Sequence, residues 1–218
     1  MYVAFDVEKR LGEFRLAARG ELREGVTCVV GPNGAGKTTL FKILAGILKP
    51  DRGRVEYVGV KSRAYVGDLY APPDSTVMDV VLAGRTRFGG RPVGREDIAA
   101  AARFAELVGV GALLQRRWGT LSGGQRQLAV VAAALATEAD LLLLDEPMAN
   151  LHGDRRAELA ELLKREARGR IIAYTTHHLD VLPCCDYVMV VEDGEIKWAG
   201  PPSQIDPARL TRPKACRL

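Results

Sequence analysis

The stretch Gly31-Pro32-Asn33-Gly34-Ala35-Gly36-Lys37-Thr38 fits the pattern G-x-x-x-x-G-K-[ST], which wraps nucleotide phosphates. Its three glycines let the backbone curl until its N–H groups point inward. Lys37 adds a positive charge where the β- and γ-phosphates would lie, and Thr38 supplies a hydroxyl for magnesium. We therefore expect this stretch, together with Thr39, to bind ATP or GTP with Mg²⁺.

The residues on either side of this loop predict a strand before it and a helix after it. Val26-Thr27-Cys28-Val29-Val30 reads as a buried strand. After the loop, apolar residues recur at the i, i+3, i+4, i+7 spacing of an amphipathic helix: Leu40, Ile43, Leu44 and Ile47. Such a helix begins at the phosphates, with the positive end of its dipole toward them. The alternative, a chance glycine-rich turn, leaves the agreement of so many positions unexplained.

The composition is that of an ordinary globular protein. The 218 residues can bury the full core of one compact domain, and the net charge of +4 comes from interspersed acidic and basic residues. We interpret this charge as a solvated surface and expect no nucleic-acid partner. The longest wholly apolar run, residues 128–136, is far shorter than the ~20 residues that a membrane-spanning helix needs. Residues 1–10 alternate apolar and charged side chains without a signal-peptide core, so we expect a cytoplasmic protein.

The four cysteines are Cys28, Cys184, Cys185 and Cys216, and none of them shows C-x-x-C spacing. Cysteine spacing is the sequence signal for structural metal sites and for disulfide frameworks. We therefore interpret these side chains as buried or incidental thiols.

The order of apolar patterns and turns predicts an α/β fold. Residues 2–7, 13–17, 54–58 and 63–66 read as short strands, the first two antiparallel. Helix formers follow at residues 76–83 and 96–108, the latter with one apolar face made by Ile98, Ala101, Ala105 and Val108. A buried parallel strand at residues 141–144, a helix at 154–168, a strand at 170–175 and a hairpin at 187–198 complete the chain.

These elements predict a P-loop nucleoside triphosphatase (NTPase) core, with a mainly parallel sheet flanked by helices. We also expect an N-terminal antiparallel β-subdomain and a helical insertion subdomain of approximately residues 71–137. Both would belong to a single nucleotide-binding domain, residues 1–218.

Three polar residues follow the predicted core strands. Asp145 ends the strand 141–144, where an acid can reach magnesium, and Glu146 follows directly, where a carboxylate can polarise an attacking water. His177 lies just past the next strand, at the carboxyl edge where ligands bind in such sheets. An Asp-Glu pair can also simply cap a strand, and a single His there is commonly structural. With the phosphate loop, the three residues indicate one hydrolytic site.

Leu121-Ser122-Gly123-Gly124-Gln125 opens a further predicted helix, in which Ser122 and Gln125 have the spacing of a capping box. With this stretch added, the sequence resembles the ATP-binding-cassette (ABC) ATPases over nearly its whole length. Residues 31–40 match the Walker A motif of that family, residues 121–125 its signature motif, residues 141–147 its Walker B motif with the catalytic glutamate, and His177 its switch histidine.

The resemblance implies that two such domains pair head to tail, the partner being a second copy or a related ATPase subunit. Each ATP would lie between the phosphate loop of one subunit and the signature residues of the other, where a helix N-terminus favours the γ-phosphate. The signature residues are Ser122, Gly123, Gly124 and Gln125. Closure would assemble both sites, and hydrolysis at Glu146, assisted by His177, would let the pair open.

Three positions depart from the family pattern. Asp68 stands where the family has a glutamine that contacts magnesium. We expect its carboxylate to join Thr38 and Asp145 around the ion, the alternative being a surface loop with a shifted alignment. Leu151-His152 replaces the usual Leu-Asp. The aromatic residue that stacks on adenine is missing from its usual place, and Phe14 is a candidate substitute.

The resemblance implies an ATPase subunit that powers a transporter, with the membrane-spanning permease on separate polypeptides and the ATPase at the cytoplasmic face of the membrane. Residues 76–85 look like the corresponding stretch of importers for iron chelates, haem and cobalamin. The competing hypothesis is a soluble ABC ATPase without transport, such as one for iron–sulfur cluster assembly or one associated with nucleic acid or ribosomes. A non-hydrolysing regulatory cassette is disfavoured, because Lys37, Asp145, Glu146 and His177 are all present.

Overall fold

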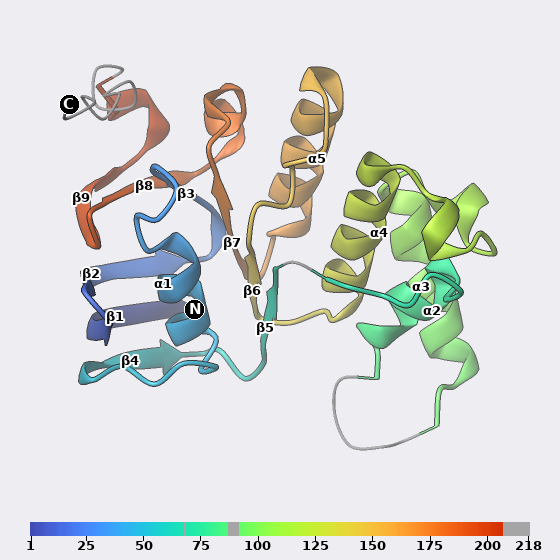
Figure 1. Cartoon of the computed structure of the whole chain (residues 1–218), viewed down its shortest axis with the longest axis horizontal. Helices are drawn as coiled ribbons and strands as arrows, with labels where there is room; N and C mark the ends of the chain where they lie inside the picture. Colours follow the sequence, from blue (N-terminus) through green and yellow to red (C-terminus); the bar gives the residue numbers. More distant parts are fainter. Residues whose placement is uncertain (68, 87–91, 207–218) are drawn as a thin grey trace.

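The structure, a computed structural model, describes residues 1–67, 69–86 and 92–206 (Figure 1). In this part of the chain the strands join into one 9-stranded sheet, in the order β4-β1-β2-β9-β8-β3-β7-β6-β5. The strands are β1 Tyr2–Leu11, β2 Phe14–Arg23, β3 Gly25–Val30, β4 Arg52–Val58, β5 Arg63–Val66, β6 Leu141–Leu144, β7 Ile171–Thr176, β8 Tyr187–Glu192 and β9 Glu195–Gly200. The α-helices are α1 Lys37–Leu44, α2 Val77–Ala83, α3 Arg95–Leu107, α4 Gly123–Ala136 and α5 Gly153–Glu166. Short 3-10 helices are η1 Gly111–Leu113, η2 Trp118–Thr120, η3 Leu179–Cys184 and η4 Pro202–Gln204.

The parallel half of the sheet forms the core and carries the phosphate loop. The strands β8, β3, β7, β6 and β5 are neighbours and run parallel. Every residue of β6 and β7 is buried, because helices cover both faces of these apolar strands. Leu141 and Leu143 pack with α1 on one face, whereas Leu142 and Leu144 pack with α4 and α5 on the other. The predicted α/β fold with a mainly parallel sheet flanked by helices is confirmed.

The N-terminal strands form an antiparallel part of the same sheet. β1 pairs with β2 on one edge and with β4 on the other. Val3, Phe5 and Val7 alternate inward along β1 and pack in the same apolar cluster as α1. β2 joins the rest of the sheet through one bridge, between Ala17 and Glu195 of β9. The predicted antiparallel start of the chain is confirmed, with β1 and β2 longer than expected.

The helices α2, α3 and α4 gather at the end of the molecule that lies away from β1, β2 and β4 (Figure 1). α2 and α4 begin with capping boxes, in which Thr76 pairs with Asp79 and Ser122 pairs with Gln125. Their buried apolar residues belong to the cluster that also covers β6 and β7. Among the described residues, none of the helices has both the length and the apolar character to cross a membrane.

Two apolar residues assigned to buried helix faces from the sequence are exposed. Ile47 is 63% exposed, because α1 ends before Gly46, whose φ of +81° turns the chain out of the helix. Ile98 in α3 is 46% exposed. Its neighbour Asp97 is buried instead, with its carboxylate 3.4 Å from the Nε of Arg85. A partly buried ion pair therefore lies next to the position where the apolar pattern predicted aliphatic packing.

The prediction of unpaired thiols is wrong for two of the four cysteines. Cys28 in β3 and Cys185 after η3 form a disulfide, with Cα atoms 6.0 Å apart and a sequence separation of 157. The pairing follows from the topology, because β3 and β8 are parallel neighbours, and Cys185 stands just before β8. Cys184 is a free, half-buried thiol. Cys216 lies outside the described residues.

Candidate functional site

The phosphate loop lies between β3 and α1, as the sequence predicts, and its glycines are needed for its shape. A Cβ on Gly31 would stand 2.0 Å from the carbonyl oxygen of Val191. Gly36 has a φ of +102° at the N-cap of α1, a conformation that glycine adopts without strain. The loop and its surroundings enclose a pocket of about 230 Å³. Its lining residues are Phe14, Asn33, Gly34, Ala35, Gly36, Lys37, Thr38, Thr39, Asp145 and Glu146.

The side chain of Lys37 is held inside the loop by backbone carbonyl oxygens of the loop. Its Nζ donates to the carbonyl oxygens of Gly31 at 2.7 Å and Pro32 at 3.1 Å, and the residue is 7% exposed. Burial lowers the pKa of Lys37, while the nearby charges of Glu146 and then Asp145 act in the opposite direction. The amine is therefore held among carbonyl and carboxylate oxygens, in the position from which it can reach bound phosphate.

The carboxylate of Asp145 accepts hydrogen bonds from hydroxyl groups on three different elements. Its Oδ2 accepts hydrogen bonds from Thr38 Oγ1 at 2.5 Å and from Tyr65 OH at 3.1 Å, and its Oδ1 accepts one from Thr175 Oγ1 at 2.5 Å. Thr38 and Asp145 thus present two hard oxygen donors at one point beside the loop, a set that fits Mg²⁺, which takes few protein ligands and keeps several waters. The described residues contain no cluster of three or more His, Cys, Asp or Glu side chains suited to a metal. Asp68, the third expected ligand, lies outside the described residues.

Glu146 and His177 meet beside this group. The Nδ1 of His177 lies 3.1 Å from the Oε2 of Glu146, although the residues come from the ends of β6 and β7. Glu146 has a φ of +49°, which is uncommon for a residue other than glycine. Its side chain is partly exposed, so the carboxylate can both contact the imidazole and accept a proton from a water.

Residues 122–125 lie at the start of α4, outside the pocket of the phosphate loop. Ser122 Oγ accepts a hydrogen bond from the backbone N–H of Gln125 at 3.3 Å, and Gln125 Oε1 accepts one from the N–H of Ser122 at 3.0 Å, so the predicted capping box forms. Gly123 and Gly124 follow in the first turn of α4. None of these four residues lines the pocket of the phosphate loop in this chain. The structure therefore brings Asp145 and Glu146 to the loop, with His177 against Glu146, and leaves residues 122–125 outside the pocket. Further along α4, Gln127 donates to the carbonyl oxygen of Glu146 at 3.5 Å.

Residues 20–149, more than half of the chain, match the ABC transporter family. The chain belongs to this family. The energy-coupling factor transporter ATP-binding protein EcfA of Methanoculleus marisnigri is 34% identical over 206 residues, which cover 88% of this chain and 73% of EcfA. It follows that the chain is a nucleotide-binding ATPase of the transporter type, and the similarity to EcfA gives no support to the soluble alternative.

A second relative and one solved structure extend this similarity. The molybdenum import ATP-binding protein ModC of Salmonella typhimurium is 34% identical over 195 residues, which cover 83% of this chain. The chain spans about half of ModC, 54% of its length. A metal-chelate type ABC transporter solved in an inward-facing conformation superposes with a TM-score of 0.82 at 27% identity, over 93% of this chain and 84% of the solved one.

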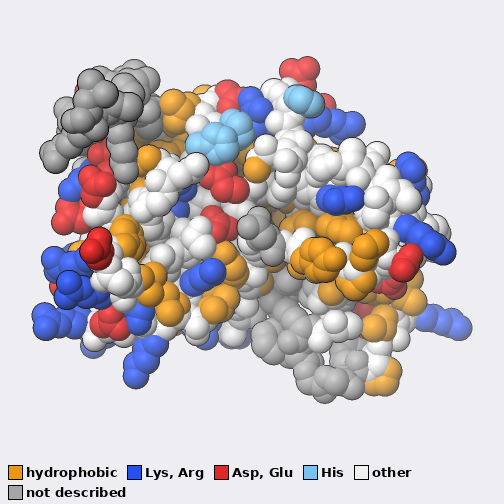
Figure 2. Space-filling view, in the orientation of Figure 1, with side chains coloured by type: hydrophobic (Ala, Val, Ile, Leu, Met, Phe, Trp, Pro, Cys, Tyr) orange, Lys and Arg blue, Asp and Glu red, His pale blue; other side chains and the backbone are white. Residues whose placement is uncertain are grey.

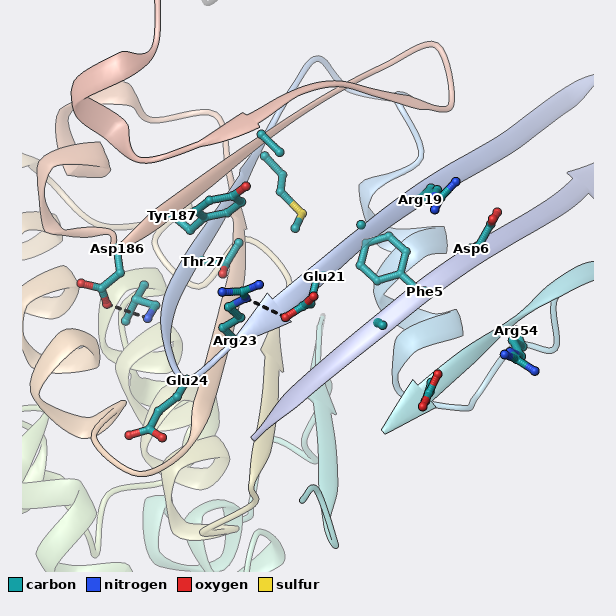
Figure 3. Close-up of a pocket in the computed structure, with 16 residues that line it drawn as sticks. Phe5, Asp6, Arg19, Glu21, Arg23, Glu24, Thr27, Arg54, Asp186 and Tyr187 are labelled. Carbon is teal, nitrogen blue, oxygen red and sulfur yellow. Dashed lines mark hydrogen bonds and ion pairs between the residues drawn. The ribbon is translucent and has the colours of Figure 1, made fainter. Parts of the chain in front are cut away.

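A larger cavity, of about 830 Å³, shares no lining residue with the pocket of the ABC phosphate loop. It opens where β2 and β9 diverge after their single bridge, and Figure 3 shows Phe5 and Thr27 among labelled charged residues around it. Arg23 pairs with Glu21 at this edge at 2.6 Å. On the face shown in Figure 2, acidic and basic side chains are interspersed, as the composition suggested.

Sequence reasoning missed two residues that hold the ABC Walker B acid. Tyr65 and Thr175 both donate to Asp145, and neither belongs to a motif. For Thr175 a signal was available, because a hydroxyl side chain in a fully buried strand needs a partner. For Tyr65 the sequence offered no comparable signal, since aromatic residues are common in strands.

Proposed function

We propose that the chain is the ATP-hydrolysing subunit of an importer whose membrane-spanning subunits are separate polypeptides. The observation that carries the proposal is the gathering of Asp145, Glu146 and His177 at the mouth of the phosphate loop. EcfA and ModC carry transporter names, and the solved structure is of a metal-chelate type, which supports transport and favours import.

The proposed chemistry assigns each residue of the pocket a role. The backbone N–H groups of residues 31–39 and the charge of Lys37 bind the β- and γ-phosphates of ATP. Thr38 and Asp145 hold Mg²⁺, and Asp68 is the proposed third ligand. The ion neutralises charge on the phosphate oxygens. Glu146 accepts a proton from the attacking water, while His177 holds the Glu146 carboxylate in place.

We further propose that hydrolysis takes place in a head-to-tail pair of ATPase subunits. In this arrangement Ser122, Gly123, Gly124 and Gln125 of one subunit cover the γ-phosphate at the loop of the other. The position of these residues at the N-terminus of α4, outside the pocket of their own chain, supports the proposal. The partner is a second copy or a related subunit. Residues 1–218 would then act as one nucleotide-binding domain, in which residues 71–137 form the helical subdomain.

The proposed location is the cytoplasmic face of the membrane, where ATP is available and a permease can bind. The test is affinity isolation of the tagged full chain from detergent-solubilised membranes of its own cells. Glu146→Gln with ATP should hold the closed pair, and Lys37→Ala is the matched variant that should not close.

Recovery of a polytopic membrane protein, enriched with Glu146→Gln over Lys37→Ala, is the expected result. Recovery of soluble partners alone, in both variants, would contradict the proposed role in transport and favour the soluble alternative.

A further inference from the structure

Thr175 links both acids of the site through one hydroxyl group. Its Oγ1 donates a hydrogen bond to Asp145 Oδ1 at 2.5 Å and accepts one from the backbone N–H of Glu146 at 2.8 Å. A hydroxyl has one hydrogen to donate and two lone pairs to accept with, so both contacts are satisfied at once. The residue is 0% exposed, near the end of β7.

The hydrogen bond between the Glu146 N–H and Thr175 is made by a residue with an unusual backbone conformation. Glu146 has a φ of +49°, which a residue with a side chain adopts only where its surroundings hold it. On the preceding residue, the N–H of Asp145 donates to the carbonyl oxygen of Val66 in β5 at 2.8 Å. The turn that carries both acids is therefore fastened to β5 at one residue and to β7 at the next.

The side chain of Glu146 is held from the same strand end. His177, whose Nδ1 lies 3.1 Å from the Glu146 carboxylate, stands two positions after Thr175. Thr175 thus fixes the backbone of Glu146, and His177 contacts its side chain. Both contacts come from the carboxyl end of β7 and the residue that follows it, whereas the carbonyl oxygen of Glu146 accepts from Ala149 at 3.2 Å and Gln127 at 3.5 Å.

We propose that Thr175 is a positioning residue for the hydrolytic base. It holds the backbone of Glu146 in the left-handed conformation, and this fixes where the base stands relative to Asp145 in the same turn. This inference rests on the proposed function, because it needs Glu146 to act as the base. Thr175 itself contacts neither substrate nor the reacting atoms.

Two substitutions separate the hydroxyl from the shape of the side chain. Thr175→Val keeps the branched shape that suits a buried strand and removes both hydrogen bonds, whereas Thr175→Ser keeps the hydroxyl. We expect Thr175→Val to lower kcat for ATP by about tenfold to a hundredfold and to leave the Kd for ATP within about twofold. Thr175→Ser should stay within about threefold of the parent in kcat.

The decisive measurement is a double-mutant cycle with Glu146→Gln, read in single-turnover assays. If Thr175 acts through Glu146, adding Thr175→Val to Glu146→Gln lowers the remaining rate by less than about twofold. A merely structural role would give losses that multiply. The melting temperature and the Kd for ATP of each variant are measured alongside. If Thr175→Val does not fold, Thr175→Ala takes its place in the same cycle.

The outcomes distinguish this inference from the proposed function. If Glu146→Gln lowers hydrolysis and Thr175→Val does not, or if their losses multiply, Thr175 has no positioning role and the proposed function stands. Hydrolysis that is undiminished in Glu146→Gln would contradict the assignment of the base, and with it both proposals.

Discussion

The ring of Phe14 reaches from the first hairpin to the phosphate loop, where a Cβ on Gly36 would stand 2.8 Å from the Phe14 Cζ. Leu16 lies on the same side, with its Cδ1 3.0 Å from that position. Only a glycine fits beneath these two side chains in this conformation. The contact places the Phe14 ring on the lining of the pocket of the loop, and we propose that this ring stacks on the adenine base.

Phe14→Ala should therefore weaken the binding of ATP by about fivefold or more, since stacking of a base on an aromatic side chain contributes about 1–3 kcal/mol. The Kd is best measured by fluorescence titration in a Glu146→Gln background, where ATP persists. Phe14→Trp keeps an aromatic face and should bind ATP nearly as the parent does, whereas Phe14→Leu keeps bulk alone. Equal affinities in all four chains would remove Phe14 from the adenine site.

Glu146→Gln should bind Mg-ATP and turn over very slowly, because an amide keeps the shape of the carboxylate but cannot accept the proton of the water. The rate should fall by about a hundredfold or more. ATP should then shift the protein from monomer to dimer in size-exclusion chromatography. A monomer with undiminished hydrolysis would show that Glu146 is not the base.

Ser122→Arg should abolish hydrolysis in the dimer and leave the binding of ATP to the monomer within about twofold of the parent. A bulky cation at the start of α4 blocks the approach of a partner, but this residue does not line the pocket of its own chain. Ser122→Ala is the matched control, since it removes the helix cap at a cost of about 1 kcal/mol without adding bulk. Loss of ATP binding by the isolated monomer, or unchanged hydrolysis, would contradict the head-to-tail pairing.

The sequence predicted what depends on contiguous residues. The phosphate loop, the strand that ends at Asp145 and the capping box at Ser122 are each written in one short stretch, so their local conformation follows from residue type and spacing. The wrong assignments, Ile47 and Ile98, fall where a glycine ends the helix early and where the neighbouring Asp97, paired with Arg85, is buried instead.

The sequence could not predict contacts between strands that are neighbours in the sheet but far apart along the chain. Thr175 lies opposite the turn at Glu146 because β6 and β7 pair. Cys28 meets Cys185, which stands three residues before Val188, the partner of Cys28 in the pairing of β3 with β8. Neither partner can be chosen from spacing along the chain, since the strand order decides which residues meet. The carboxyl-edge rule brought Asp145 and His177 to one edge but gave no register.

Asp68→Asn should raise the magnesium concentration at which ATPase activity is half-maximal, if the Asp68 carboxylate contacts the ion or one of its waters. Activity is measured across a magnesium titration at fixed ATP. Asp74→Asn, which removes an exposed carboxylate paired with Arg117, is the control for a change of surface charge. A half-maximal concentration that does not move would exclude Asp68 from the metal site.

The disulfide between Cys28 and Cys185 gives a prediction about the chemical state of the chain. The protein has four cysteines, so the chain from acid-quenched cells, denatured and labelled without reductant, should carry label on two thiols, and on four when it is reduced before labelling. Cross-linking residues so far apart in sequence restricts the unfolded chain, so Cys28→Ser should lower the free energy of unfolding by about 2–4 kcal/mol.

Because β3 leads directly into the phosphate loop, Cys28→Ser is also expected to weaken the binding of ATP as the loop loses support. Cys184→Ser, which changes the adjacent free thiol, is the matched control and should alter neither quantity. Disulfides are rare where glutathione keeps thiols reduced. The number of labelled thiols must therefore be measured on protein from acid-quenched cells and not on protein purified in air. Four labelled thiols without reduction, together with equal stability of Cys28→Ser and Cys184→Ser, would show that the two sulfurs are thiols in the cell.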